Sequence, residues 1–311
     1  MKKNIISSLL TSTVILAFTY YVFTNLSDFQ SLFEISLLVI FIVGLSKLIK
    51  FFFNGLFIQW TIEVFTKRFS LSESVYVSIL SAVGNFFGPL LGGATIRAVY
   101  LKKVHKLSYS FFLSTLAGYY VILFSIYSFL GVISLLFISE DTGKSGLLLF
   151  FFLWFIFMLT MVFFRLPSRK KIKNLEKINQ VIKLLDIIYQ IEDGWREILK
   201  RKNLLIKLII LALLGLLVTG LTTYIEFKAI GVSIGFAALG VHTALSATSI
   251  LISITPGAIG IKEGILLINS SVMGVTNDQI LQVALIDRGV TFIVLAVLYI
   301  FSKQIKSRIT I

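Results

Sequence analysis

Five charged residues lie within otherwise apolar stretches of the chain. They are Arg97, the neighbours Lys262 and Glu263, and the neighbours Asp287 and Arg288. A charge near the centre of a bilayer costs at least about 2.5–3.5 kcal/mol, so each of these side chains needs a partner or a wet site. Arginine is well suited to a lipid phosphate, because its guanidinium can hold two phosphate oxygens at once.

Two interpretations of these charges stay open. In the first, Glu263 and Arg288 form an ion pair that only pins two helices together. In the second, Arg97, Arg288 or Lys262 binds a lipid phosphate, and Glu263 and Asp287 are the acids at membrane depth. The sequence is compatible with both.

Four other charged residues are expected nearer the membrane surface. We expect Lys47, Lys50 and Lys207 to lie towards the ends of their spans and to extend their ammonium groups to the cytoplasmic interface. Glu226 is expected at the outer end of its span. These four residues therefore enter no predicted site.

The composition identifies an integral membrane protein. Of 311 residues, 57% are hydrophobic and 14% are charged, whereas a soluble domain has roughly 45–50% and about 25%. The 29 Lys and Arg exceed the 15 Asp and Glu; the positive-inside rule and anionic lipid headgroups explain this excess better than nucleic acid. The chain has no cysteine and two distant histidines, and it lacks known catalytic motifs. We therefore expect no metal, no cofactor and no enzymatic activity.

The hydropathy pattern predicts six transmembrane helices and two interrupted apolar regions. A span needs about 20 apolar residues, and the six spans are predicted at 5–24, 33–58, 108–138, 146–164, 204–228 and 277–302, with interrupted regions at 72–104 and 236–274. The loop charges place both termini on the cytoplasmic side of the inner membrane. Six spans with two re-entrant hairpins satisfy this orientation, and ten full spans satisfy it equally well.

A basic segment, 165–203, joins two halves of a single membrane domain, about 1–165 and 204–311. It holds eleven Lys or Arg against five acids, and apolar residues recur in it at spacings of three and four. This pattern predicts an amphipathic helix on anionic headgroups of the cytoplasmic leaflet. A solvated connector between the halves is the alternative.

The two interrupted regions share an ordered set of residues. Each has a proline, then glycines, then a charged residue, and finally a hydroxyl residue that can cap the next long helix. The first set comprises Asn85, Pro89, Gly92, Gly93, Arg97 and Ser108, and the second comprises Pro256, Gly257, Gly260, Glu263 and Thr276. Because the predicted orientation enters the two regions from opposite sides, we predict an inverted-topology repeat.

Interrupted backbone at membrane depth survives only inside protein or beside a wet cavity. Two half-helix ends meeting near the midplane would present free N–H groups to an anion. The alternative is that these Pro and Gly residues are ordinary kinks and packing contacts. The ordered repeat favours the cavity, and the predicted fold is an all-α membrane protein with six spans and two opposed re-entrant hairpins.

At these motifs the chain resembles the transmembrane region of lysylphosphatidylglycerol synthases, a family of flippase-like membrane proteins. Its first motif is matched by Asn85, Pro89, Gly93 and Arg97, and its second by Pro256, Gly257, Gly260 and Glu263, with a later arginine at Arg288. Ala94 stands where the family often has Asp, Lys262 where it has Arg, and Tyr119 and Tyr120 replace an Asp-Arg pair.

The resemblance implies that the chain moves a phospholipid or polyprenyl-phosphate-linked lipid between leaflets. Because the sequence stops soon after the last predicted span, we do not expect lipid aminoacylation. Two alternatives stay open: a lipid-binding subunit that scaffolds a glycosyltransferase or lipid-modifying enzyme, and a secondary transporter of small solutes. A homo-oligomer is possible in each case.

Overall fold

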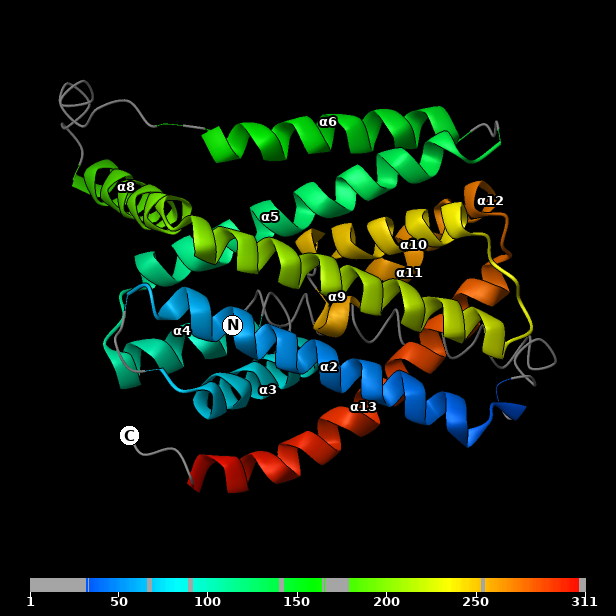
Figure 1. Ribbon diagram of the computed structural model, residues 1–311, viewed down its shortest axis with the longest axis horizontal. Helices are drawn as coiled ribbons and strands as arrows, with labels where there is room; N and C mark the ends of the chain where they lie inside the picture. Colours follow the sequence, from blue (N-terminus) through cyan, green and yellow to red (C-terminus); the bar gives the residue numbers. More distant parts are fainter. Residues whose placement is uncertain are drawn as a thin grey trace.

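The computed structural model is all-helical where it describes the chain, namely at residues 32, 34–65, 69–88, 92–139, 143–163, 165, 179–252 and 255–307. Eleven α-helices occur in these residues. The long helices run roughly side by side and form a stack from α6 to α13 (Figure 1). This arrangement confirms the all-α membrane class.

Five helices are long and apolar enough to cross a membrane: α2 (Leu37–Ile62), α5 (Tyr109–Leu136), α6 (Lys144–Phe163), α9 (Lys202–Ala229) and α13 (Asn277–Ser307). They match five of the six predicted spans within a few residues, and the predicted span 5–24 lies outside the described residues. Ser108 caps α5 through the backbone N–H of Phe111. Thr276 and Gln279 form the predicted reciprocal capping box at α13. These local signals set the helix starts.

Both predicted interruptions occur. In the first region, α3 (Leu71–Phe87) ends before α4 (Gly92–His105) begins, and Pro89 lies outside the described residues. The second contains α10 (Phe236–Thr248), the 3-10 turns η3 (Ser249–Ile252) and η4 (Pro256–Ala258), α11 (Ile261–Ile268) and α12 (Ser270–Met273). Gly257 and Gly260 have φ values of +59° and +80°, which side chains disfavour.

The remaining helix, α8 (Asn179–Lys200), confirms the predicted helix in the basic segment. It packs against α5, where Trp195 is buried and the Ser114 hydroxyl donates to the Gln190 carbonyl at 3.4 Å. In Figure 1, α8, α3 and α4 lie at the same ends of the long helices, on the left of the view, whereas α10 to α12 lie towards the opposite ends. Part of the apolar face of α8 therefore contacts protein.

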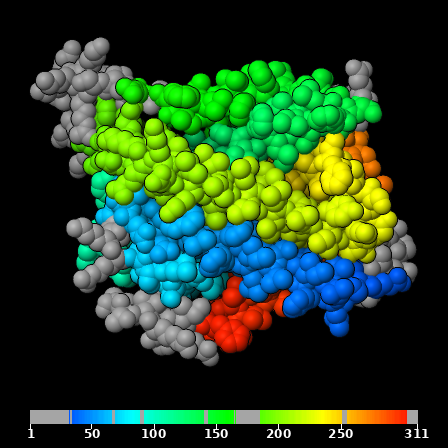
Figure 2. All heavy atoms as spheres, in the orientation of Figure 1, coloured from blue at the N-terminus to red at the C-terminus, as the bar shows by residue number. Residues whose placement is uncertain are grey.

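The exterior of the helix stack is strongly apolar. Figure 2 shows α9 and α2 side by side across one face. Their exposed side chains include Phe41 and Leu221, which are 68% and 62% exposed. Such a surface suits hydrocarbon, while the polar side chains described below lie between the helices.

Candidate functional site

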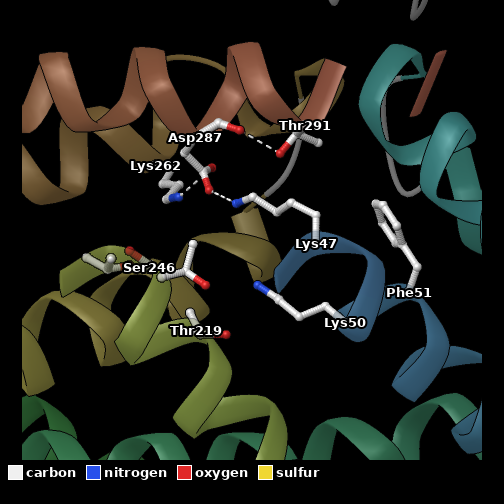
Figure 3. Close-up of a pocket in the computed structure, with 10 residues that line it drawn as sticks. Lys47, Lys50, Phe51, Thr219, Ser246, Lys262, Asp287 and Thr291 are labelled. Atoms are coloured by element: carbon white, nitrogen blue, oxygen red, sulfur yellow. Dashed lines mark hydrogen bonds and ion pairs between the residues drawn. The ribbon is translucent and has the colours of Figure 1, made fainter. Parts of the chain in front are cut away.

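A polar cavity of about 200 Å³ lies between α2, α9, α10, α11 and α13 (Figure 3). Nine of its ten lining residues carry an ammonium, carboxylate or hydroxyl group. The lining residues are Lys47, Lys50, Phe51, Thr219, Thr222, Thr223, Ser246, Lys262, Asp287 and Thr291. The cavity therefore brings residues from both halves of the sequence into one charged site.

The cavity lies deep along the helices that line it. Lys47 is the eleventh residue of α2 and Asp287 the eleventh of α13, and both helices begin at the same end of the stack (Figure 1). At 1.5 Å per residue, each lies about 15 Å from the start of its helix. That is half of a hydrocarbon core of roughly 30 Å.

Asp287 holds two ammonium groups at once. Its Oδ1 accepts from Lys47 Nζ, and its Oδ2 lies 3.4 Å from Lys262 Nζ. Lys47 Nζ is also 3.9 Å from Glu226 Oε1. Lys47 and Glu226 are nearly inaccessible, with side-chain exposures of 8% and 2%. Breaking a pair of this kind leaves a buried charge, which costs about 3–5 kcal/mol.

Lys50 differs from the other two lysines. Its ammonium group points into the space beside Thr219 (Figure 3). Within the described part of the chain it donates no hydrogen bond and joins no ion pair. The buried hydroxyl oxygen of Ser246, another lining residue, has no hydrogen-bond partner there either. Two polar groups of the cavity are thus available to a ligand.

Three of the other hydroxyl groups are already donating within their own helices. Thr219 donates to the Gly215 carbonyl at 2.8 Å and Thr222 to the Val218 carbonyl at 2.6 Å. Thr291 donates to the Asp287 carbonyl at 2.6 Å. A hydroxyl has a single proton to donate, so these three present only acceptor lone pairs to the cavity.

The predicted ion pair between Glu263 and Arg288 is confirmed. Arg288 donates to Glu263 Oε1 from Nε at 2.9 Å and from Nη2 at 2.6 Å, and its Nη1 donates to the Gly257 carbonyl at 3.1 Å. The second oxygen of Glu263 accepts from the Gly260 N–H at 2.8 Å. One carboxylate thus caps α11 and ties the irregular turn to α13.

Arg97 lies apart from these pairs, in the interface of α3, α4 and α5. It is 8% exposed, and its Nε lies 3.4 Å from Ser81 Oγ, a long hydrogen bond. Tyr119 and Tyr120 are close enough to interact with its charge. No carboxylate pairs with this guanidinium in the residues that the structure describes. Arg97 is therefore a buried cation whose counter-charge is not supplied by the described protein.

Asn85 acts on the backbone of the same region. Its Oδ1 accepts from the Gly93 N–H at 2.8 Å, where α4 begins. The amide thereby satisfies one of the free N–H groups at a helix start. Gly92 and Gly93 lie against the α3 backbone near Gly84, where a larger residue would collide.

The interface positions predicted for Lys47 and Lys50 are wrong, and Glu226 lies near the end of α9 as predicted but is not exposed. Lys47 and Lys50 occupy the middle of α2 and face inward, and Glu226 is 1% exposed. One signal in the sequence indicates that these two lysines are buried: both lie near the centre of a 26-residue apolar helix and not near its ends. Lys207, by contrast, is exposed, and its ammonium group lies 5.6 Å from the Trp60 ring centroid.

Both interruption motifs lie within a region of the sequence that a known protein family shares. The family described as the lysylphosphatidylglycerol synthase TM region matches residues 5–298, nearly the whole chain. The chain belongs to this family. No curated protein gives a match. As a member of the lysylphosphatidylglycerol synthase transmembrane family with five apolar, membrane-length helices, it is a multi-pass membrane protein.

The residues that match the family's two motifs lie at the two helix interruptions. Those that the structure describes in the first motif, Asn85, Gly93 and Arg97, lie at the α3–α4 interruption. Gly257, Gly260 and Glu263 of the second motif lie at the interruption before α11, and Glu263 holds Arg288. In this member of the family, Asp287, beside Arg288, also pairs with two of the three cavity lysines, Lys47 and Lys262.

Proposed function

We propose that this protein moves a phospholipid or a polyprenyl-phosphate-linked lipid between the two leaflets of the cytoplasmic membrane. The observation that carries the proposal is the charged cavity about halfway along the membrane-length helices, in a chain of this family. Buried charges at such depth typically mark a substrate or ion pathway. Transport, rather than catalysis, is the use of the site that we propose.

The proposed architecture has six spans and two re-entrant hairpins in an inverted repeat, with both termini cytoplasmic. Two features support it. The helices α3 and α4 have 17 and 14 residues, and α10 and α11 have 13 and 8, short of the roughly 20 residues of a typical span. The two groups also lie towards opposite ends of the long helices, and α8, from the basic segment 165–203, lies at the same end as α3 and α4 (Figure 1).

Within this proposal the charged residues have different tasks. Arg97, which lies outside the cavity lining, has no carboxylate partner among the described residues and is proposed as a separate phosphate contact along the lipid path. Arg288 has three of its donors engaged by Glu263 and the Gly257 carbonyl, so it positions the second interruption. The glycines at both breaks permit the close backbone approach that a narrow lipid path requires.

A secondary transporter of small anions is the second candidate. The cavity volume of about 200 Å³ lies below the roughly 300–1,000 Å³ of typical small-molecule sites. A lipid would therefore place only its headgroup there and leave its acyl chains in the bilayer, whereas a small anion would fit entirely.

The experiment is transbilayer movement of headgroup-labelled phospholipids and of a polyprenyl phosphate in liposomes containing the purified protein. We expect the protein to accelerate movement of at least one lipid, and Arg97→Ala to slow it by about tenfold or more, since hydrogen bonds to charged groups contribute roughly 1.5–3 kcal/mol. Lys207→Met, which alters an exposed lysine, is the matched control.

Two results would overturn the proposal. Movement that neither Arg97→Ala nor Lys50→Met slows would mean that the protein only perturbs the bilayer. The absence of movement for every lipid would favour either anion transport, measured by uptake into the same liposomes, or a scaffolding subunit, tested by co-purification with a glycosyltransferase or lipid-modifying enzyme.

A further inference from the structure

The cavity around Asp287 carries an excess of positive charge. Three ammonium groups, those of Lys47, Lys50 and Lys262, are close to two carboxylates, those of Asp287 and Glu226. When all five groups are ionised, one positive charge is unbalanced. Such a charge in a site of low dielectric strongly favours the entry of an anion.

The unbalanced charge can be assigned to Lys50. Lys47 and Lys262 each occupy a separate oxygen of Asp287, and Glu226 lies 3.9 Å from Lys47. Lys50 interacts electrostatically with all four of these groups but hydrogen-bonds to none of them. Its ammonium group therefore keeps its donors for a ligand.

A second donor faces the same space. The Ser246 hydroxyl is buried and without a hydrogen-bond partner in the described chain, although buried hydroxyl groups are normally paired. The hydroxyl groups of Thr219, Thr222 and Thr291 are committed to backbone carbonyls. Lys50 and Ser246 thus offer N–H and O–H donors from opposite elements, α2 and α10, to one acceptor-rich group.

We propose that this cavity is a binding site for a phosphate group with a single net negative charge, held by Lys50 and Ser246. Lys47 and Lys262, fixed by Asp287, frame the group and add to the positive field. The cavity volume of about 200 Å³ equals that of about seven waters at roughly 30 Å³ each, which accommodates a phosphate and a few waters but no acyl chains. The phosphate is either part of a lipid headgroup or free in solution.

This site deepens the proposed function, on which its role in transport rests, by naming the headgroup charge. Three ammonium groups repel a cationic, aminoacylated headgroup. Asp287 is engaged by two of them, and Glu226 lies 3.9 Å from Lys47. The lipid that fits this cavity is therefore an anionic one, with an uncompensated phosphodiester or a phosphomonoester that keeps one proton.

The test is equilibrium binding to the full-length protein in a non-ionic detergent. Three probes are used: inorganic phosphate, short-chain phosphatidylglycerol, and a short-chain diacylglycerol that lacks the phosphate. The variants are Lys50→Met, which keeps the length of the side chain and removes its charge, Lys50→Arg, which keeps the charge, and Lys207→Met as the control on an exposed lysine. Thermal unfolding of each variant establishes that it is folded.

We expect a phosphate-containing probe to bind, Lys50→Met to weaken this binding by at least about tenfold, and Lys50→Arg and Lys207→Met to retain it. Binding of phosphatidylglycerol but not of inorganic phosphate would identify a lipid headgroup as the ligand, and comparable binding of both would identify free phosphate. Equal binding of the diacylglycerol, full affinity in Lys50→Met, or no binding of either phosphate probe would overturn the site.

The binding test and the transport test fail separately. A protein that binds phosphatidylglycerol through Lys50 but moves no lipid retains the anion site and loses the translocase proposal. A protein that moves lipid with the same rate and headgroup preference after Lys50→Met retains the translocase proposal and loses this site.

Discussion

At the α3–α4 interruption an amide holds the broken backbone, whereas at the interruption before α11 a carboxylate does so. Asn85 accepts from Gly93 in the first region, and Glu263 accepts from Gly260 in the second. The arginines near the two interruptions also differ, in whether an acid pairs with them. Arg288 is held by Glu263, and Arg97 has no acid partner among the described residues.

We call the region around Arg288 locked, because its ion pair is satisfied within the protein. The region around Arg97 is unlocked, because its guanidinium has no acid partner among the described residues. Arg288 and its carboxylate satisfy each other and tie α11 to α13, so removing one member leaves a buried charge. Arg97 already carries the cost of desolvation with only a long hydrogen bond to Ser81 and two nearby tyrosines. This state supports our proposal that Arg97 contacts a lipid phosphate, because an anion would offset the cost of desolvation.

The largest expected effect is a loss of stability when the charge of Asp287 is removed from the cavity beside the interruption before α11. Asp287→Asn leaves Lys47 and Lys262 without their shared carboxylate. We expect the free energy of unfolding to fall by about 4 kcal/mol, within the 3–5 kcal/mol of a broken buried pair. Equilibrium unfolding in mixed detergent measures it. Adding Lys47→Met should recover part of the lost stability. An unchanged free energy of unfolding in Asp287→Asn alone would show that Asp287 is solvated.

The second effect compares the two arginines directly. Glu263→Gln should destabilise the protein by about 3 kcal/mol, because the partly exposed Arg288 loses its carboxylate. Arg97→Met should leave the stability unchanged or increase it, because no ion pair among the described residues is broken. The same unfolding measurement serves for both. Equal destabilisation by the two variants would contradict the distinction between a locked and an unlocked region.

The smallest effect concerns the backbone of the first region. Asn85→Ala removes the acceptor of the Gly93 N–H and should cost about 1–2 kcal/mol, as expected for an unsatisfied buried donor. Asn85→Asp restores an acceptor oxygen and serves as the matched comparison. Amide hydrogen exchange at Gly93 should accelerate in Asn85→Ala; an unchanged rate would mean that this hydrogen bond does not hold the turn.

Much of the helix pattern follows from local signals in the sequence. Five predicted spans match helices within a few residues, and Ser108 and Thr276 cap the helices for which their spacing predicts it. The interruption before α11 coincides with Gly257 and Gly260, whose positive φ values end regular helix. These features are predictable because backbone hydrogen bonding and apolar length act over a few neighbouring residues.

The site was only partly predictable. The pair of Glu263 and Arg288 follows from two opposite charges that must both be buried. Two of the three cavity lysines, Lys47 and Lys50, are predicted at the interface instead, because a long lysine can reach the surface from many positions along a span. Lys47 and Asp287 are 240 residues apart, and no local pattern connects them.

By itself, the sequence determined that the chain is a helical membrane protein with charges at depth and two breaks in its helices. The cost of unsatisfied backbone and unsolvated charge in hydrocarbon dictates these features wherever the helices pack. Only the tertiary structure decided which charges meet. The packing of α2, α11 and α13 places Lys47 and Lys262 on one carboxylate and leaves Lys50 without one among the described residues. The packing of α3, α4 and α5 likewise leaves Arg97 without an acid partner among those residues. Side-chain pairing between helices depends on their rotation and depth, which distant parts of the chain set together.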